Sequence, residues 1–357
     1  MIASIKDPLI LIHDIHKDML LLAQESSSSN SSSDAIPIPR LLPARLSRLR
    51  CLLYDERRIN QSQTVAHDTM TGLLQTNVIR LLLTHLIPLP FESRKDVAAT
   101  FNYLLVCGLE GADAPLYHDT MISFATFIQQ HFQDIMTPII QGHACTNTNT
   151  PDIVLHCGSM YRACLKSPIL YQQLVQSTSR VEAFIFPLLD IHCHEPNFDL
   201  ASDAMETIRL VLTDDNSSEF LQRDYEALFN DRLNPLLAQQ GHNMYYIVKR
   251  MVLQIIMTVL LTRANYVIMI QYIQSKANLI LIMLLLRDTS PHITWDAFHV
   301  FKIFVANPNK PKDIIKILTD NKVKLVKYLE GLHKEKECAD AQFLEEKALV
   351  ISTLEEL

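Results

Sequence analysis

The sequence predicts an all-α fold in which helical repeats stack into a solenoid, and three observations lead to this prediction. Glycine is scarce, because the 7 glycines among 357 residues make up about 2% of the chain, well below the ~7% that is usual in globular proteins. Many stretches carry apolar residues at helical spacing, and few alternate as strands do. Core positions also recur every 46–47 residues, a period typical of armadillo and HEAT repeats. We therefore expect a right-handed, armadillo- or HEAT-like α-solenoid.

The N-terminal part of the chain divides into two segments. Residues 1–25 are predicted to form an N-terminal helical segment, with the helix itself over about 8–25. Charged residues interrupt its apolar run, which argues against a secretory signal peptide. The run SSSSNSSS and the three prolines that follow it predict a Ser/Pro-rich flexible linker over residues 26–44.

Residues 45–340 are predicted to form the repeat array. Core helices aligned on Gly158, Ala204, Met251 and Ala297 lie at intervals of 46, 47 and 46 residues. An earlier copy at Ala98 lies 60 residues before Gly158, with the extra length in a polar loop over residues 142–151. Because one such repeat cannot bury its apolar face alone, neighbouring repeats must share a continuous core.

The last repeat shows how its helix is specified. Thr294 can serve as the N-cap, and Asp296 places an acid in the first turn, where the helix dipole favours it. Asn307-Pro308 ends the helix, and Pro311 can open the next one. An apolar stripe at helical spacing predicts the buried face: Ala297, Val300, Phe301, Phe304 and Val305.

The segments beside this helix complete the array. Residues 231–244 predict an extended turn between repeats, and two amphipathic helices follow at about 313–336 and 339–355. We expect residues 341–357 to form a C-terminal capping helix that covers the apolar end of the array.

Five segments, in order, resemble the calcium-binding protein 39 family of Mo25-like and Hym-type helical-repeat scaffolds, and the resemblance covers roughly residues 45–330. It implies a non-catalytic scaffold or adaptor that binds and allosterically activates a sterile-twenty-type protein kinase or pseudokinase. It also implies binding through a concave face and a C-terminal peptide pocket, in cell polarity and morphogenesis signalling. The segments are FESRKDVAATFNYLL (91–105), LHCGSMYRACLKSPIL (155–170), FDLASDAMETIRLVLT (198–213), YIVKRMVLQIIMTVLLTRANYVIM (246–269) and ITWDAFHVFKIFVANPNK (293–310).

Composition and motifs exclude several other functions. The net charge of −7 gives no basic excess for nucleic acid, and no apolar run approaches the ~20 residues needed to span a bilayer. Seven cysteines, an odd number, fit a reduced, cytoplasmic protein. No phosphate-binding loop, dinucleotide-binding or hydrolase motif occurs, so we expect no enzyme activity and no cofactor.

No metal site is expected either. The segment Thr213–Asn216 lacks the glycine and the bidentate glutamate of a calcium loop. The cluster His192-Cys193-His194-Glu195 fits a surface turn better than a metal site, because adjacent residues on a short loop rarely point at one ion. A Cys/His nucleophile pair stays open at this stage, although no spacing selects one.

The first candidate partner site lies in KRMVLQIIMTVLLTRANY. Arg250, Arg263 and Tyr266 are the candidate contacts, with Lys249 and Asn265 beside them. Arginine and tyrosine are favoured interface anchors, and the resemblance implies that Arg263 and Tyr266 lie on the concave face that contacts the kinase. The alternative is a snorkelling arginine and a core tyrosine.

The second candidate is a peptide pocket formed by Met283 and Lys324. Residues 310–327 hold six lysines against two aspartates, which suits a hydrophobic peptide with an acidic group or terminal carboxylate. The resemblance implies a Trp-Glu-Phe peptide from the tail of the STRAD pseudokinase. Asp320 stands where animal relatives commonly carry lysine. An i, i+4 pair with Lys324 would weaken anion binding, so Asp320→Lys is expected to tighten binding by about 1 kcal/mol.

The alternative to the kinase scaffold is a general solenoid peptide-binding adaptor unrelated to kinases. For the second candidate site alone, the alternative is a solvated lysine face over a buried methionine, with no ligand. An adaptor that binds basic peptides through a Trp-Asn ladder is excluded, because Trp295 is the only tryptophan.

Overall fold

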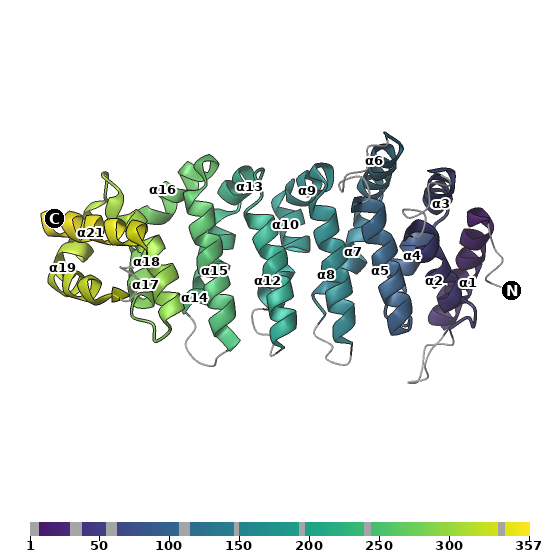
Figure 1. Ribbon diagram of the computed structural model, residues 1–357, viewed down its shortest axis with the longest axis horizontal. Coiled ribbons are helices and arrows are strands. Elements are labelled where there is room, and N and C mark those ends of the chain that lie inside the picture. Colours follow the sequence, from purple (N-terminus) through teal and green to yellow (C-terminus); the bar gives the residue numbers. More distant parts are fainter. Residues whose placement is uncertain are drawn as a thin grey trace. The chain divides into compact units, whose positions relative to one another are not determined.

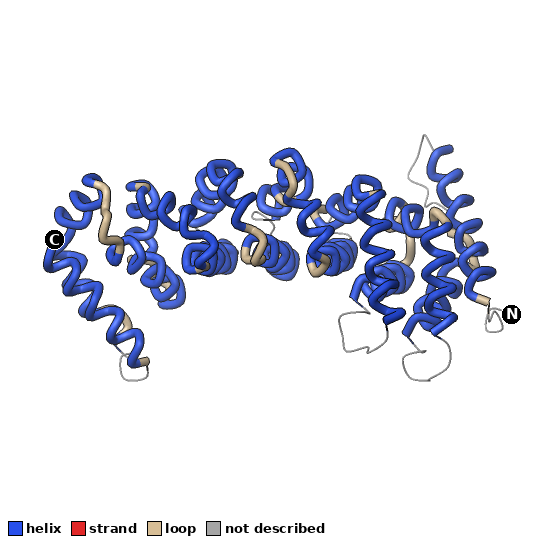
Figure 2. The backbone as a smooth tube through the Cα atoms, turned by 90° about the horizontal axis from the view of Figure 1, so that it is seen from above, coloured by secondary structure: helices blue, strands red, loops and turns tan. Residues whose placement is uncertain are grey.

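The computed structural model describes residues 7–28, 38–54, 63–106, 115–145, 150–192, 197–238, 244–334 and 340–357. Every regular element in these ranges is a helix, and they contain no strand (Figure 2). The predicted all-α class is therefore confirmed. The helices group into two compact units, Met1–Leu210 and Val211–Leu357.

The first unit stacks long helices beside one another (Figure 1). Its helices are α1 (Pro8–Ser28), α2 (Leu42–Tyr54), α3 (Gln63–Gln75), α4 (Val78–Thr84), α5 (Phe91–Val106), α6 (Pro115–Gln130), α7 (Phe132–His143), α8 (Pro151–Leu165), α9 (Pro168–Val175), α10 (Thr178–Phe184), α11 (Phe186–His192) and α12 (Phe198–Leu212). Arg50 and Asp96 join α2 to α5 at 2.6 Å. Arg94 and Asp152 join α5 to α8 at 2.8 Å. Ion pairs between successive repeats thus accompany the shared apolar core.

The second unit continues the pattern with α15 packed on α18, and α19 in contact with both α17 and α21. Its elements are α13 (Ser218–Arg223), the π-helix η3 (Glu226–Leu233), α14 (Asn234–Ala238), α15 (Met244–Leu261), the 3₁₀ turn η4 (Arg263–Asn265), α16 (Tyr266–Gln274), α17 (Lys276–Leu285), α18 (Pro291–Ala306), α19 (Lys312–Gly331) and α21 (Ala341–Glu356).

Three segment boundaries differ from the sequence-based prediction. Helix α1 runs to Ser28, three residues into the predicted linker, and α2 begins at Leu42, before its predicted end. Residues 29–37, the rest of that linker's serine-rich part, lie outside the described residues. The predicted turn at 231–244 is wrong as far as Ala238, because η3 and α14 occupy it. Apolar residues buried there, such as Leu233 and Leu237, keep the backbone helical.

Helix α18 confirms the predicted stripe, since all five of its apolar residues are fully buried. Its start differs from the prediction, because the helix begins at Pro291, and Thr294 lies inside it. The Thr294 hydroxyl donates to the Pro291 carbonyl at 3.0 Å and lies 3.0 Å from His333 Nε2. Proline at the first helical position needs no N–H partner there. Asn307 follows the last helical residue, as predicted.

Helices α19 and α21 cap one another's C-terminal ends. Lys347 of α21 is buried, and its ammonium donates to the carbonyl of Leu332, just past α19, at 2.7 Å. Lys322 of α19 donates to the carbonyl of Glu355 at 2.5 Å. Carbonyls in the last turn of a helix have no partner within the helix, and a cation there also opposes the helix dipole. The two lysines therefore fix α21 against α19.

A second set of contacts holds α21 on α18. Phe343 packs on Trp295 with ring centroids 4.6 Å apart, and Lys302 pairs with Glu346 at 2.6 Å. Burial raises the pKa of Glu346, but hydrogen bonds from Lys302 and Gln342 outweigh it and leave the pKa below its usual value. The C-terminal helix α21 thus covers apolar surface of α18.

Candidate functional site

The first candidate surface is the corner between α15 and α16, where the helix directions differ by 83°. Tyr266 is 62% exposed there, and Arg263 is exposed beside it. Leu261 and Val267 are also more than half exposed. We call these four residues the corner surface. The exposure of Tyr266 excludes the core alternative, and an aromatic among exposed apolar groups is chemically suited to a protein partner.

Arg250 and Asn265 do not join the corner surface. Arg250 lies eleven residues before Leu261 on α15, about 16 Å along the helix. Its Nε donates to Oδ2 of the buried Asp296 at 3.3 Å, so part of its side chain serves the α15–α18 contact. Asn265 is only 2% exposed. Its grouping with the surface residues was therefore wrong, because a polar residue type alone does not reveal that its partners are backbone atoms.

The second candidate is a pocket of about 700 Å³ between α17 and α19, and both Met283 and Lys324 line it. Met283 and Lys324, which lie in distant segments of the sequence, thus come together in one pocket. The volume is typical of ligand pockets in proteins. Helix α17 and the two residues after it contribute Ile280, Met283, Leu284, Leu286 and Arg287, and α19 contributes Ile317, Asn321, Lys324, Leu325 and Tyr328.

The charged side chains among the described residues that line this pocket are both positive. They are Arg287 and Lys324, one from each wall. The Tyr328 hydroxyl donates to the Leu286 carbonyl and so ties the walls together. Burial raises the pKa of Tyr328, while the charge of Arg287 acts in the opposite direction. Sequence reasoning missed Arg287, although its place at the end of an apolar helix was a usable signal.

Asp320 does not act as predicted. It is exposed and does not line the pocket. Among the ion pairs of the described residues, none joins it to Lys324. Four residues bring two side chains to one helical face, but exposed pairs gain little energy to hold them together. The described structure therefore gives no pairing of Asp320 with Lys324 that would compete with a ligand in the pocket.

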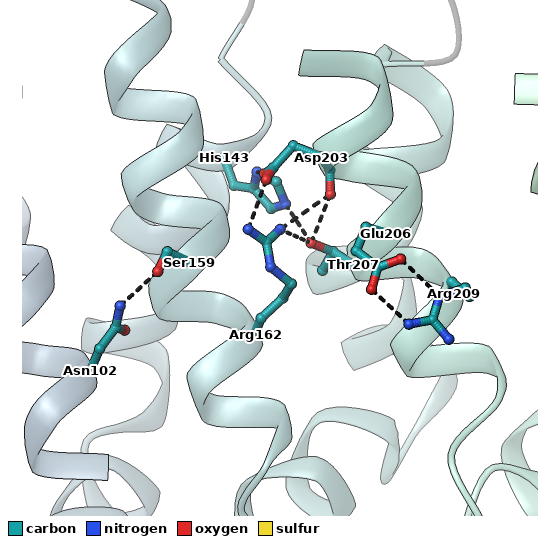
Figure 3. Close-up of polar contacts among 8 residues, drawn as sticks. All are labelled: Asn102, His143, Ser159, Arg162, Asp203, Glu206, Thr207 and Arg209. Atoms are coloured by element: carbon teal, nitrogen blue, oxygen red, sulfur yellow. Dashed lines mark hydrogen bonds and ion pairs between the residues drawn. The ribbon is translucent and has the colours of Figure 1, made fainter. Parts of the chain in front are cut away.

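A partly buried polar cluster in the first unit was also missed (Figure 3). Arg162 of α8 pairs with Asp203 of α12 at 2.7 Å and donates to the Thr207 hydroxyl at 2.9 Å. His143, at the end of α7, places Nε2 3.0 Å from the same hydroxyl. Gly158 makes room, because a Cβ there would lie 2.2 Å from Asp203 Oδ2. These contacts connect α7, α8 and α12.

The described residues offer no activated Cys/His pair at the cysteines of α8. Burial raises the pKa of Cys157 to about 12, with Cys145 acting in the same direction. Burial also raises the pKa of Cys164. These thiols are therefore protonated at neutral pH and are poor nucleophiles.

Metal and membrane features can be stated for the described residues alone. They contain no group of three or more His, Cys, Asp or Glu side chains that could hold a metal ion. Cys193–Glu195 of the His-Cys-His-Glu motif lie outside them. Within the same ranges, no single helix is long and apolar enough to cross a membrane; α15 and the bent segment after it reach that length only together.

Comparisons with known proteins agree over nearly the whole chain. A Mo25-like protein of Schizosaccharomyces pombe is 32% identical over 87% of this chain and 87% of its own length. A calcium-binding protein 39-like protein of Mus musculus is 30% identical over 99% and 96%. The degreening-related dee76 protein of Auxenochlorella protothecoides is 33% identical over 85% and 86%. Among solved structures, a designed armadillo repeat protein matches with a TM-score of 0.42 and 13% identity, over 79% of this chain and 99% of that one.

The family model described as Mo25-like matches residues 4–357. It includes all five segments whose order and spacing suggested the resemblance, together with the corner surface and the pocket. This chain therefore belongs to the Mo25-like family.

Proposed function

We propose that this chain is a non-catalytic, cytoplasmic scaffold that binds a sterile-twenty-type kinase or pseudokinase and favours its active conformation. The observation that carries the proposal is the pocket in which Met283 and Lys324 meet. An apolar floor with cations on both walls suits a short peptide that joins aromatic side chains to carboxylates. A Trp-Glu-Phe-ending tail of the kinase or pseudokinase has this chemistry.

The corner surface provides the second contact, to the folded kinase domain. Tyr266 and Arg263 are exposed in the free chain, so burying them against a partner would gain contact area without disturbing the core. Arg250 supports this contact from further along α15, although its Nε also donates a hydrogen bond to Asp296. Two separate contacts raise the overall affinity, because binding of the tail makes docking of the kinase domain intramolecular.

Activation follows as a population shift. A kinase is active only when its lysine–glutamate ion pair next to helix αC is formed. A scaffold that binds this state better than the inactive one shifts the equilibrium by its difference in affinity. A coupling of about 1–3 kcal/mol gives roughly 5- to 150-fold activation without any catalytic group on the scaffold.

The experiment uses a purified sterile-twenty-type kinase domain and a separate Trp-Glu-Phe-ending peptide. We expect the chain to raise phosphorylation of a model substrate. Arg263→Ala with Tyr266→Ala should weaken kinase binding by more than about 2 kcal/mol and leave the melting temperature nearly unchanged. Lys327→Ala, exposed on α19 and outside the pocket lining, is the matched control. Absence of binding to both kinase domain and peptide would refute the proposal.

The general peptide adaptor remains a second candidate, since the same pocket supports it. If the peptide binds in a Met283-dependent manner while the kinase domain neither binds nor responds, the adaptor is correct and the kinase role is wrong.

A further inference from the structure

We propose that Asn265 is a positioning residue that holds the corner surface in the conformation that its partner recognises. The inference rests on the proposed function, because it names what presents Arg263 and Tyr266. Asn265 lies between them in sequence, yet its side chain points inward and is 2% exposed. The neighbours on either side are exposed. One buried amide thus lies in the chain between the two exposed candidate contact residues.

The side chain of Asn265 ends helix α15. Its Nδ2 donates to the carbonyl of Val259 at 3.1 Å, one of the last four carbonyls of α15, which have no partner within the helix. The Thr262 hydroxyl donates to the Thr258 carbonyl at 2.8 Å, and the Asn265 N–H donates to the Thr262 carbonyl at 2.9 Å. The sharp change of direction at the corner is therefore fixed by local polar contacts.

The same amide also connects the corner to the preceding repeat. Its Oδ1 accepts a hydrogen bond from the Ser218 hydroxyl of α13 at 2.5 Å, 47 residues earlier, which is one repeat length. A side chain here must donate to one partner and accept from another. Aspartate lacks the donor and alanine lacks both, so asparagine is specified chemically. Without it, a buried carbonyl and a hydroxyl lose their partner, at a cost that favours rearrangement of the corner.

A second buried asparagine provides a matched comparison. Asn278 is also 2% exposed, donates to the Tyr272 carbonyl at 3.0 Å and accepts from Asn234 of the preceding repeat at 3.0 Å. It bridges repeats in the same way but lies in α17, away from the corner. Loss of either asparagine should lower stability similarly, and only loss of Asn265 should change what the corner presents.

The test is a double-mutant cycle with a purified sterile-twenty-type kinase domain that lacks its tail, so that the pocket is not engaged. In the wild-type chain, Tyr266→Ala should weaken binding about tenfold or more. In the Asn265→Ala background the same change should cost less than about twofold, because the tyrosine is no longer held in place. In the Asn278→Ala background the tenfold loss should persist. A tenfold loss in all three backgrounds overturns the inference.

Hydrogen exchange separates this inference from the proposed function. In the free chain, the backbone amides of residues 262–267 should exchange faster in Asn265→Ala than in wild type. In Asn278→Ala, their exchange rates should equal those of the wild type. If Asn265→Ala fails to fold, Ser218→Ala replaces it in both measurements. If the kinase domain does not bind, or Tyr266→Ala has no effect, the proposed function fails and exchange alone decides whether Asn265 positions the corner; unchanged exchange then overturns it.

Discussion

For the replacement of Gly158 by alanine, sequence and structure predict opposite effects on the free energy of unfolding. The repeat alignment places Gly158 where other repeats carry Ala204, Met251 and Ala297. In a helix interior, alanine is more favourable than glycine by about 1 kcal/mol. In the structure, however, a Cβ at Gly158 would lie 2.2 Å from Asp203 Oδ2 and 2.7 Å from His143 Cε1. Neither distance is a tolerable contact.

The contacts around Gly158 determine how much stability the alanine variant loses. Relieving the overlap means moving His143, which is fully buried, or Asp203, which holds Arg162 at 2.7 Å. Overpacking a core typically costs 1–3 kcal/mol, and the shielded ion pair weakens as well. These costs exceed the gain in helix propensity, so we expect Gly158→Ala to lower the free energy of unfolding by about 1–3 kcal/mol.

Urea unfolding followed by circular dichroism measures this change, with Gly331→Ala as the matched control. A Cβ at Gly331, the last residue of α19, meets nothing within 4 Å. That variant should be neutral or more stable by up to about 1 kcal/mol. If Gly158→Ala is as stable as wild type, the close approach of α12 to α8 is wrong.

Three further predictions concern the second unit. Met283→Ala should weaken binding of a Trp-Glu-Phe-ending peptide in calorimetric titrations, whereas Asp320→Lys should change it by less than about 0.5 kcal/mol, because that exposed aspartate lies outside the pocket. Lys347→Met should destabilise the docking of α21 by about 1–3 kcal/mol, since the buried carbonyl contact of Leu332 and the partly buried one of Glu330 lose their donor; Trp295 fluorescence reports it. Because the pKa of Glu346 is lowered in the folded chain, its stabilising contribution is present above its ordinary value of 4.5 and is lost as the pH falls through the lower, folded value.

Control variants distinguish these specific effects from a non-specific loss of stability. A tenfold tighter peptide complex for Asp320→Lys would show that the aspartate does neutralise the pocket. Lys334→Met, at an exposed lysine near the end of α19, should leave the Trp295 signal unchanged; an equal effect there would contradict the capping role of Lys347. Glu346→Gln should remove part of the acid dependence of α21 docking, and an unaltered pH profile would count against the Lys302 contact.

The sequence by itself determined the features that depend on local patterns. Helical periodicity identified the buried face of α18, and Asn307-Pro308 identified its end, because propensity and amphipathicity act within one or two turns. The repeat interval and the five ordered segments identified the family. The family resemblance implied that Met283 and Lys324 belong to one site, and in the structure both line one pocket.

The tertiary structure alone decided which polar residues are surface and which are structural. Asn265 and Tyr266 are adjacent in the chain, yet one is 2% and the other 62% exposed. The buried Asn265 is bound by the Val259 carbonyl and by Ser218, a full repeat away. Likewise, Gly158 is specified by Asp203 of the next repeat, and Asp320 is exposed outside the pocket lining. Contacts between repeats decide these roles, and no pattern within one repeat contains that information.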